Sequence, residues 1–145
     1  MKIYLDNCCY NRPFDDQLQE RIHLDSEEIL TILKRGQTGV YQIVGSFMLE
    51  LEMERMSDVV KRHRVQELYK VAVETVSYTE EVKKRAQVIK AKSKIRTFDS
   101  LHIAAAEAAK ADVMLTTDDK LEKMAMKLEL GVKVMNPLKF AWEVI

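Results

Sequence analysis

Acidic side chains occur at four places where an apolar segment ends or a helix rich in small residues begins. They are Asp6, Glu50 or Glu52, Asp99 and Asp118. If the apolar segments are neighbouring parallel strands, their carboxyl ends meet at one edge of a sheet and bring these carboxylates together. Carboxylates are the ligands that Mg²⁺ and Mn²⁺ prefer, and such ions activate water and neutralise a leaving oxygen. The pattern therefore predicts a metal-dependent hydrolase acting on phosphodiesters.

Each acid also has an ordinary explanation. Asp99 and Asp118 could each cap a helix, the two glutamates could be solvated, and Asp6 could lie in a turn. Asp6 is the strongest candidate ligand, because a carboxylate that ends an apolar strand is costly unless it is paired or binds a cation. Glu50 and Glu52 point to different faces of a helix, so one at most faces the site. We favour Glu50.

The elements that must position these acids alternate between strand and helix. The expected strands are 3–5, 40–44, 113–115 and 132–135, with a short extended piece at 75–78. The first expected helix spans 22–33 and is closed by Gly36, and the second begins after Ser46 as its cap. A third spans 58–71, a fourth begins at a capping box of Ser77 and Glu80, and a fifth begins at Thr97. The last spans 120–130 and is stopped by Gly131. Residues 11–16 read as a loop. The alternation predicts one α/β domain over residues 1–145, a three-layer α/β/α arrangement with a mainly parallel sheet of four to five strands.

Composition places the chain among globular proteins, with 145 residues, 47% hydrophobic and 32% charged. No apolar run is long enough to span a membrane, and the N-terminus does not resemble a secretory signal, so we expect a cytoplasmic protein. Cys8 and Cys9 are adjacent and offer no disulfide framework or zinc spacing. We expect both to be reduced.

The 23 basic and 23 acidic residues cancel, so any site for a polyanion must be a local patch. Seven basic residues and no acid lie between positions 83 and 96, directly before Asp99. We expect RNA contacts from Lys90, Lys92, Lys94 and Arg96 of this run, and from Arg12 in the loop after Asp6. The alternative is a solvated helix face. Aromatic residues do not interleave with the run, so no platform for base stacking is visible.

Two blocks carry a resemblance to a known family. They are LDNCCYNRPFDD near the start and TFDSLHIAAAEAAKADVMLTTDDKL, which contains Asp99, His102, Ala104, Thr116 and Asp118. Together with the acids between them they resemble the PIN-domain ribonucleases, a family that includes VapC-type toxins, from Lys2 to about Val134. The resemblance implies that Asp6, Glu50 or Glu52, Asp99 and Asp118 bind Mg²⁺ or Mn²⁺ and that the protein hydrolyses RNA. It also implies a homodimer and an antitoxin partner.

One departure from the family concerns the residues after Asp6. Many members read Asp-Thr-Asn at this point, whereas this chain reads Asp6-Asn7-Cys8. Asn7 or Asn11 is expected to supply the missing hydrogen bonds. A competing hypothesis follows from the departure: a non-catalytic PIN-like module that binds RNA or protein.

The remaining polar residues near the acids are expected to play supporting parts. Thr116 and Thr117 could orient a ligating carboxylate by hydrogen bonding. His102 reads as a packed histidine, and Asp119 as a helix cap. The methionines at 48, 53 and 56 make their helix unusually apolar, and any exposed part of it could receive a partner helix or a second protomer.

Overall fold

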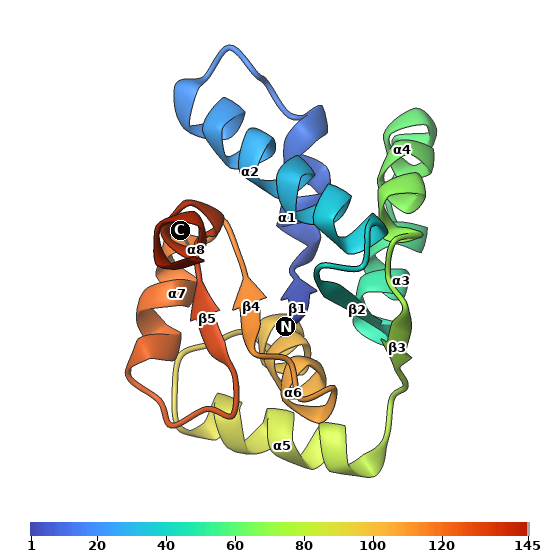
Figure 1. The fold of residues 1–145 in the computed structure, drawn as a ribbon. Coiled ribbons are helices and arrows are strands. Elements are labelled where there is room, and N and C mark those ends of the chain that lie inside the picture. Colours follow the sequence, from blue (N-terminus) through green and yellow to red (C-terminus); the bar gives the residue numbers. More distant parts are fainter. Residues whose placement is uncertain (145) are drawn as a thin grey trace.

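A sheet of five parallel strands forms the centre of the protein, seen in a computed structural model that describes residues 1–144. The strands are β1 (Lys2–Leu5), β2 (Gln42–Ser46), β3 (Glu74–Val76), β4 (Val113–Leu115) and β5 (Lys133–Met135). Their order is β3-β2-β1-β4-β5, so β1 is central, and Leu5 is in register with Leu115 of β4. The predicted three-layer α/β/α class with four to five strands is confirmed (Figure 1).

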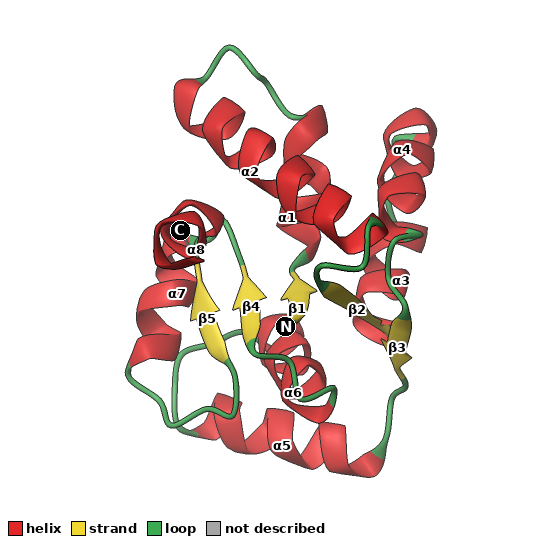
Figure 2. Ribbon diagram, in the orientation of Figure 1, coloured by secondary structure: helices red, strands yellow, loops and turns green. Residues whose placement is uncertain are grey.

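Helices connect the strands, as Figure 2 shows. They are α1 (Asn7–Asn11), the 3₁₀ turn η1 (Arg12–Phe14), α2 (Glu20–Gln37), α3 (Phe47–Glu54), α4 (Val59–Tyr69), α5 (Glu80–Ala91), α6 (Thr97–Ala108), α7 (Asp119–Met126) and α8 (Pro137–Val144). Ser46 caps α3 as predicted, since its side chain accepts from the backbone N–H of Leu49. The cap of α5 is Thr79, not Ser77.

Several expected boundaries were wrong. Residues 11–16 are not a simple loop, because Asn11 ends α1 and the next three residues form η1. Helix α7 ends at Met126, four residues before the expected end at position 130. Helix α8 was not expected, although Pro137 at its first position is a common helix start. Met48 and Met53 are buried in the core, so they offer no exposed surface to a partner.

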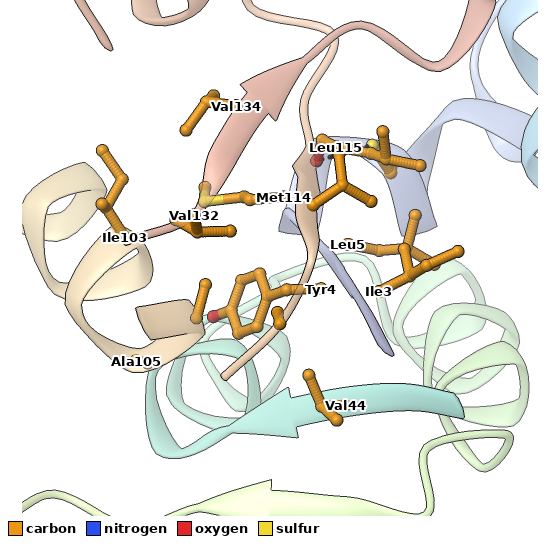
Figure 3. Packing of buried hydrophobic residues seen from close by; sticks show 14 of the residues in the cluster. Ile3, Tyr4, Leu5, Val44, Ile103, Ala105, Met114, Leu115, Val132 and Val134 are labelled. Atoms are coloured by element: carbon orange, nitrogen blue, oxygen red, sulfur yellow. Dashed lines mark hydrogen bonds between the residues drawn. The ribbon is translucent and has the colours of Figure 1, made fainter. Parts of the chain in front are cut away.

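Side chains of β1 point alternately to the two faces of the sheet. Figure 3 shows Tyr4 on the side of Ile103 and Ala105 of α6, with Ile3 and Leu5 on the opposite side. Ala104, Ala105 and Ala106 are all buried, and their small size lets α6 approach the strands closely. Helix α5 packs along α6, and α2 packs against α8. The carboxyl end of β1 is therefore held between layers that fix where Asp6 lies.

None of the described helices combines the length and the apolar character that crossing a membrane requires.

Candidate metal centre

Asp6 lies at the carboxyl end of the central strand and is only 7% exposed. Its backbone N–H donates to the carbonyl of Leu115 on β4, at 3.0 Å. Its Oδ1 accepts from the backbone N–H of Asn7, at 2.7 Å, which caps α1. Its Oδ2 accepts from Thr116 Oγ1, at 3.1 Å. The strand end and three neighbouring groups thus fix the orientation of this carboxylate.

Glu52 reaches the same place from α3. Its carboxylate is hydrogen-bonded to Nε2 of His102, a nitrogen that lies 3.7 Å from Asp6 Oδ1. Asp6, Glu52 and His102 each offer one ligand atom within 4.8 Å of the others, a spacing at which they could hold a metal ion.

His102 is buried, and it belongs to a chain of hydrogen bonds beneath the sheet edge. Its Nδ1 lies 2.6 Å from Tyr4 Oη, and that hydroxyl lies 2.7 Å from Ser46 Oγ. The Ser46 oxygen also accepts from the first turn of α3, the helix that carries Glu52. His102 is thus packed, as expected, but it also fixes the orientation of Glu52.

The choice of Glu50 over Glu52 does not agree with this arrangement. Glu50 is exposed on α3 and lies near Tyr69, whose pKa is raised by burial and by the charge of Glu50, among other causes. Glu50 and Glu52 are two residues apart, which on a helix means about 200° of rotation, so only one can face Asp6. The packing of α3 turns Glu52 toward the site and Glu50 away from it.

Asp99 and Asp118 complete the acidic group and share one cation. Arg96 Nε lies 3.3 Å from Asp99 Oδ2, and its guanidinium lies 4.0 Å from Asp118 Oδ2. Asp118 is also the N-cap of α7, since its Oδ1 accepts from the backbone N–H groups of Lys120 and Leu121. The cap that we expected of Asp119 is therefore made by Asp118, and Asp119 instead pairs with Arg21 at 2.9 Å.

All four carboxylates line one cavity of about 300 Å³, which we call the carboxylate cavity. Its lining consists of Asp6, Asn7, Cys8, Asn11, Asp15, Glu52, Lys61, Arg96, Asp99 and Asp118. The acids arrive from the ends of β1 and β4, from α3 and from the first turn of α6. The convergence that strand-end acids predicted is therefore present, with Glu52 in place of Glu50.

The surroundings of Asp99 and His102 shift the pKa of both side chains. Burial raises the pKa of Asp99, and the nearby charge of Asp6 raises it further, against the opposing effect of Arg96. Burial would lower the pKa of His102, but the charges of Asp6 and Glu52 together outweigh it, and the net shift is upward. The site therefore holds more negative charge than its own cations neutralise, and its oxygen-rich lining fits Mg²⁺ or Mn²⁺.

The residues expected to support the acids differ in whether they contact a carboxylate. Thr116 donates to Asp6 and accepts from the backbone N–H of Asp118, so it links two carboxylates. Thr117 contributes its backbone N–H, which donates to Cys8 Sγ at 3.4 Å. The Oδ1 of Asn7 is buried and has no hydrogen-bond partner within the described chain. Cys8 Sγ lies 3.5 Å from both Asp6 Oδ2 and Thr116 Oγ1, so the thiol occupies the space beside Asp6.

Of the basic residues expected to contact RNA, only Arg96 lines the carboxylate cavity. Lys90 donates to Thr97 Oγ1 at 2.6 Å, and Lys92 and Lys94 are exposed outside the cavity lining. Arg12 is turned away and pairs with Asp25 at 3.5 Å and Asp15 at 3.7 Å.

Sequence reasoning missed one cation in the carboxylate cavity, Lys61 of α4. Its Nζ lies 2.9 Å from Asp15 Oδ1. In the sequence, nothing distinguished Lys61 from the other residues of its polar helix. Helix α4 packs beside α1, and this packing brings Lys61 to the cavity.

Comparison with known families and structures gives one family match. The model of the PIN domain matches residues 24–127, which include Glu52, Asp99 and Asp118. No curated protein matches the chain significantly.

Two solved structures resemble this one in fold. The crystal structure of VapBC2 from Rickettsia felis bound to a DNA fragment from its promoter aligns with a TM-score of 0.59 and 12% identity, over 94% of this chain and 98% of the other. The structure of FitAB bound to the IR36 DNA fragment aligns with a TM-score of 0.60 and 19% identity, over 93% and 94%. At such low identity the likeness concerns the fold alone.

Proposed function

Because the chain belongs to the PIN domain family, we propose that it is a metal-dependent endoribonuclease that hydrolyses RNA phosphodiester bonds. The observation that carries the proposal is the convergence of four carboxylates from separate elements on one cavity. Structural carboxylates are normally matched by cations of the chain, whereas here burial and the charge of Asp6 raise the pKa of Asp99. An arrangement of this kind is what a divalent cation needs.

Asp6, Glu52, Asp99 and Asp118 are the proposed ligands of Mg²⁺ or Mn²⁺. When bound, such an ion would lower the pKa of an attacking water and neutralise charge at the phosphate. Thr116 holds Asp6 by a hydrogen bond and His102 holds Glu52, and such partners orient ligands and strengthen binding.

Two cations of the carboxylate cavity are proposed to position the RNA. Arg96 is 79% exposed at its side chain and spans Asp99 and Asp118, so it can exchange a carboxylate for a phosphate oxygen. Lys61 also lines the cavity and pairs with Asp15. Together they offset the negative potential that the acids present to a polyanion.

A second candidate function is a PIN-like module that binds RNA without cutting it. The observation that favours it is Cys8, whose thiol lies beside Asp6 where many family members carry an asparagine. A thiol is a weaker hydrogen-bond donor than an amide, so it supports the carboxylate less firmly.

We also propose that the protein acts as the toxin of a toxin–antitoxin pair in the cytoplasm, as a homodimer that an antitoxin binds. The support is the fold shared with VapBC2 and FitAB, both of which were solved as assemblies bound to DNA. Copurification of the chain with the product of a neighbouring small reading frame, followed by its mass in solution, tests this part.

The catalytic proposal is tested by calorimetric titration with Mg²⁺ and Mn²⁺ and by cleavage of pooled RNA on the same samples. Wild type should bind metal and cut RNA, and Asp6→Asn should lose both. Glu52→Gln and Glu50→Gln form a matched pair on one helix, and only the first should weaken metal binding and cleavage. RNA binding by the wild type without metal binding or cleavage would support the non-catalytic module instead.

A further inference from the structure

A second concave site lies next to the carboxylate cavity, between α5 and α6. It is a groove of about 190 Å³ lined by Tyr78, Lys83, Ala86, Gln87, Lys90, Thr97, Ser100 and Leu101. A dry cavity of about 150 Å³ is enough for a benzene ring. The α5–α6 groove therefore has room for one flat ring.

The α5–α6 groove and the carboxylate cavity share the first turn of α6. Thr97 and Ser100 line the groove, and Asp99, between them in sequence, lines the cavity. Asp99 and Ser100 are consecutive residues of α6, so their Cα atoms lie about 3.8 Å apart and their side chains are about 100° apart around the helix. A molecule whose phosphate lies at the carboxylates can thus place a neighbouring group in the α5–α6 groove.

One buried polar group of the α5–α6 groove lacks a partner within the described residues, whereas Lys90 and Thr97 hydrogen-bond to each other. Ser100 is 1% exposed, and its hydroxyl has no hydrogen-bond partner within residues 1–144. A buried hydroxyl without a partner costs free energy, and this one can both donate and accept. The exposed amide of Gln87 offers a further donor and acceptor at the same groove. These groups suit the edge of a heterocyclic base.

The rim of the α5–α6 groove has the charge and the aromatic surface that a nucleotide requires. Lys83 and Lys90 line it, and none of its described lining residues is acidic. Tyr78 is 53% exposed. The centroids of its ring and the Phe47 ring lie 5.1 Å apart, with an interplanar angle of 75°. This edge-to-face contact holds the Tyr78 ring in place and leaves one of its faces free. Single-stranded RNA is recognised by aromatic stacking and hydrogen bonds to unpaired base edges.

We propose that the α5–α6 groove binds one unpaired base of an RNA, flanking the phosphate that the carboxylate cavity holds. Tyr78 stacks on the base, Ser100 and Gln87 contact its edge, and Lys83 and Lys90 contact the adjoining phosphates. This inference rests on the proposed function, which supplies RNA as the substrate. It adds a site that determines which base the protein prefers. Of the seven basic residues between positions 83 and 96, Lys83 and Lys90 thus act through the α5–α6 groove and Arg96 through the carboxylate cavity.

The test is binding of fluorescently labelled, short RNA homopolymers of adenosine, cytidine or uridine by the wild-type protein in EDTA, where cleavage is absent. Wild type should prefer one base. Tyr78→Leu should weaken binding by about 5- to 150-fold, the range that stacking of one base gives. Ser100→Ala should reduce the preference for that base without lowering the melting temperature, since it removes an unpartnered buried hydroxyl.

Matched controls separate the groove from the general surface. Lys84 is exposed on the same helix outside the groove lining, and Trp142 is 81% exposed on α8. Lys83→Ala should weaken binding of every homopolymer and lower its salt dependence, whereas Lys84→Ala and Trp142→Leu should do neither.

Three outcomes would overturn the inference: no RNA binding by the wild type, equal binding of the three RNAs, or no effect of Tyr78→Leu and Ser100→Ala. A change from dimer to monomer in Tyr78→Leu with RNA binding unchanged would overturn it too, by assigning the groove to a contact between copies. Base-selective binding without metal-dependent cleavage would leave the groove intact and reject the proposed nuclease. Metal-dependent cleavage with no base selectivity in binding would support the proposed nuclease and reject the base site in the groove.

Discussion

Glu122 and the acids of the carboxylate cavity lie at the same edge of the sheet but have different partners. Glu122 is 4% exposed, its Oε2 accepts from the backbone N–H of Asn136 at 2.7 Å, and its Oε1 accepts from Lys139 Nζ at 2.9 Å. The carboxylate cavity instead gathers five acids, which are the four proposed ligands and Asp15, with Arg96 and Lys61 as the basic residues of its lining. The buried carboxylate of Glu122 is thus paired within the chain, whereas the acids of the carboxylate cavity outnumber the basic residues of its lining.

Burial alone therefore does not distinguish a structural acid from a candidate metal ligand. Glu122 ties the end of β5 to α7 and α8, and its loss should harm the fold. The acids of the carboxylate cavity repel one another, so the loss of one should harm metal binding and not the fold.

Asp99→Asn should lower RNA cleavage at least about 100-fold, more than the 10- to 100-fold that loss of a partner outside the ligand sphere typically costs. Because burial and Asp6 raise the pKa of Asp99, the neutral amide should leave the free energy of unfolding unchanged or higher in metal-free buffer. Cleavage rates and urea denaturation on one sample check both. Retained cleavage would remove Asp99 from the ligand set.

His102→Gln should weaken Mg²⁺ or Mn²⁺ binding by about 10- to 100-fold, because it breaks the contact that orients Glu52. Raising the metal concentration should restore cleavage in this variant, which it should not do for Asp99→Asn. Calorimetric titration checks the affinity. Unchanged affinity would make His102 a packing residue only.

Glu122→Ala should lower the free energy of unfolding by about 1–3 kcal/mol, the cost of leaving a buried donor without its acceptor. Metal affinity and cleavage should stay at the wild-type level below the melting transition. Lys139→Ala, which removes the largely exposed partner, should cost less. A loss of metal affinity in Glu122→Ala would erase the distinction between the two regions.

The stability of the metal-free protein should fall as pH rises above 6.5, the ordinary pKa of histidine. The pKa of His102 is raised in the folded protein, so its stabilisation is present below 6.5 and lost as pH rises through the folded pKa. Urea denaturation in EDTA at several pH values measures the decline. Saturating Mg²⁺ should flatten it, and Glu122→Ala should keep the wild-type slope.

Much of the fold could be predicted because the local signals agree. Short apolar runs at β1, β4 and β5 and Ser46 as a cap all placed elements correctly within a few residues. The helices that were not predicted are short or terminal. Helix α1 has five residues, and α8 follows β5 directly. Such helices form because they pack against other parts of the chain, as α8 does against α2.

The sequence by itself determined which residue types occur at strand ends, and therefore that Asp6 and Asp118 converge. It did so because parallel strands share one carboxyl edge. Only the tertiary structure decided that Glu52 and not Glu50 joins them, that Lys61 and not Arg12 lines the carboxylate cavity, and that Ser100 and Tyr78 share a groove. These outcomes depend on how each helix is rotated about its axis and docked, and that is set by packing among residues distant in sequence.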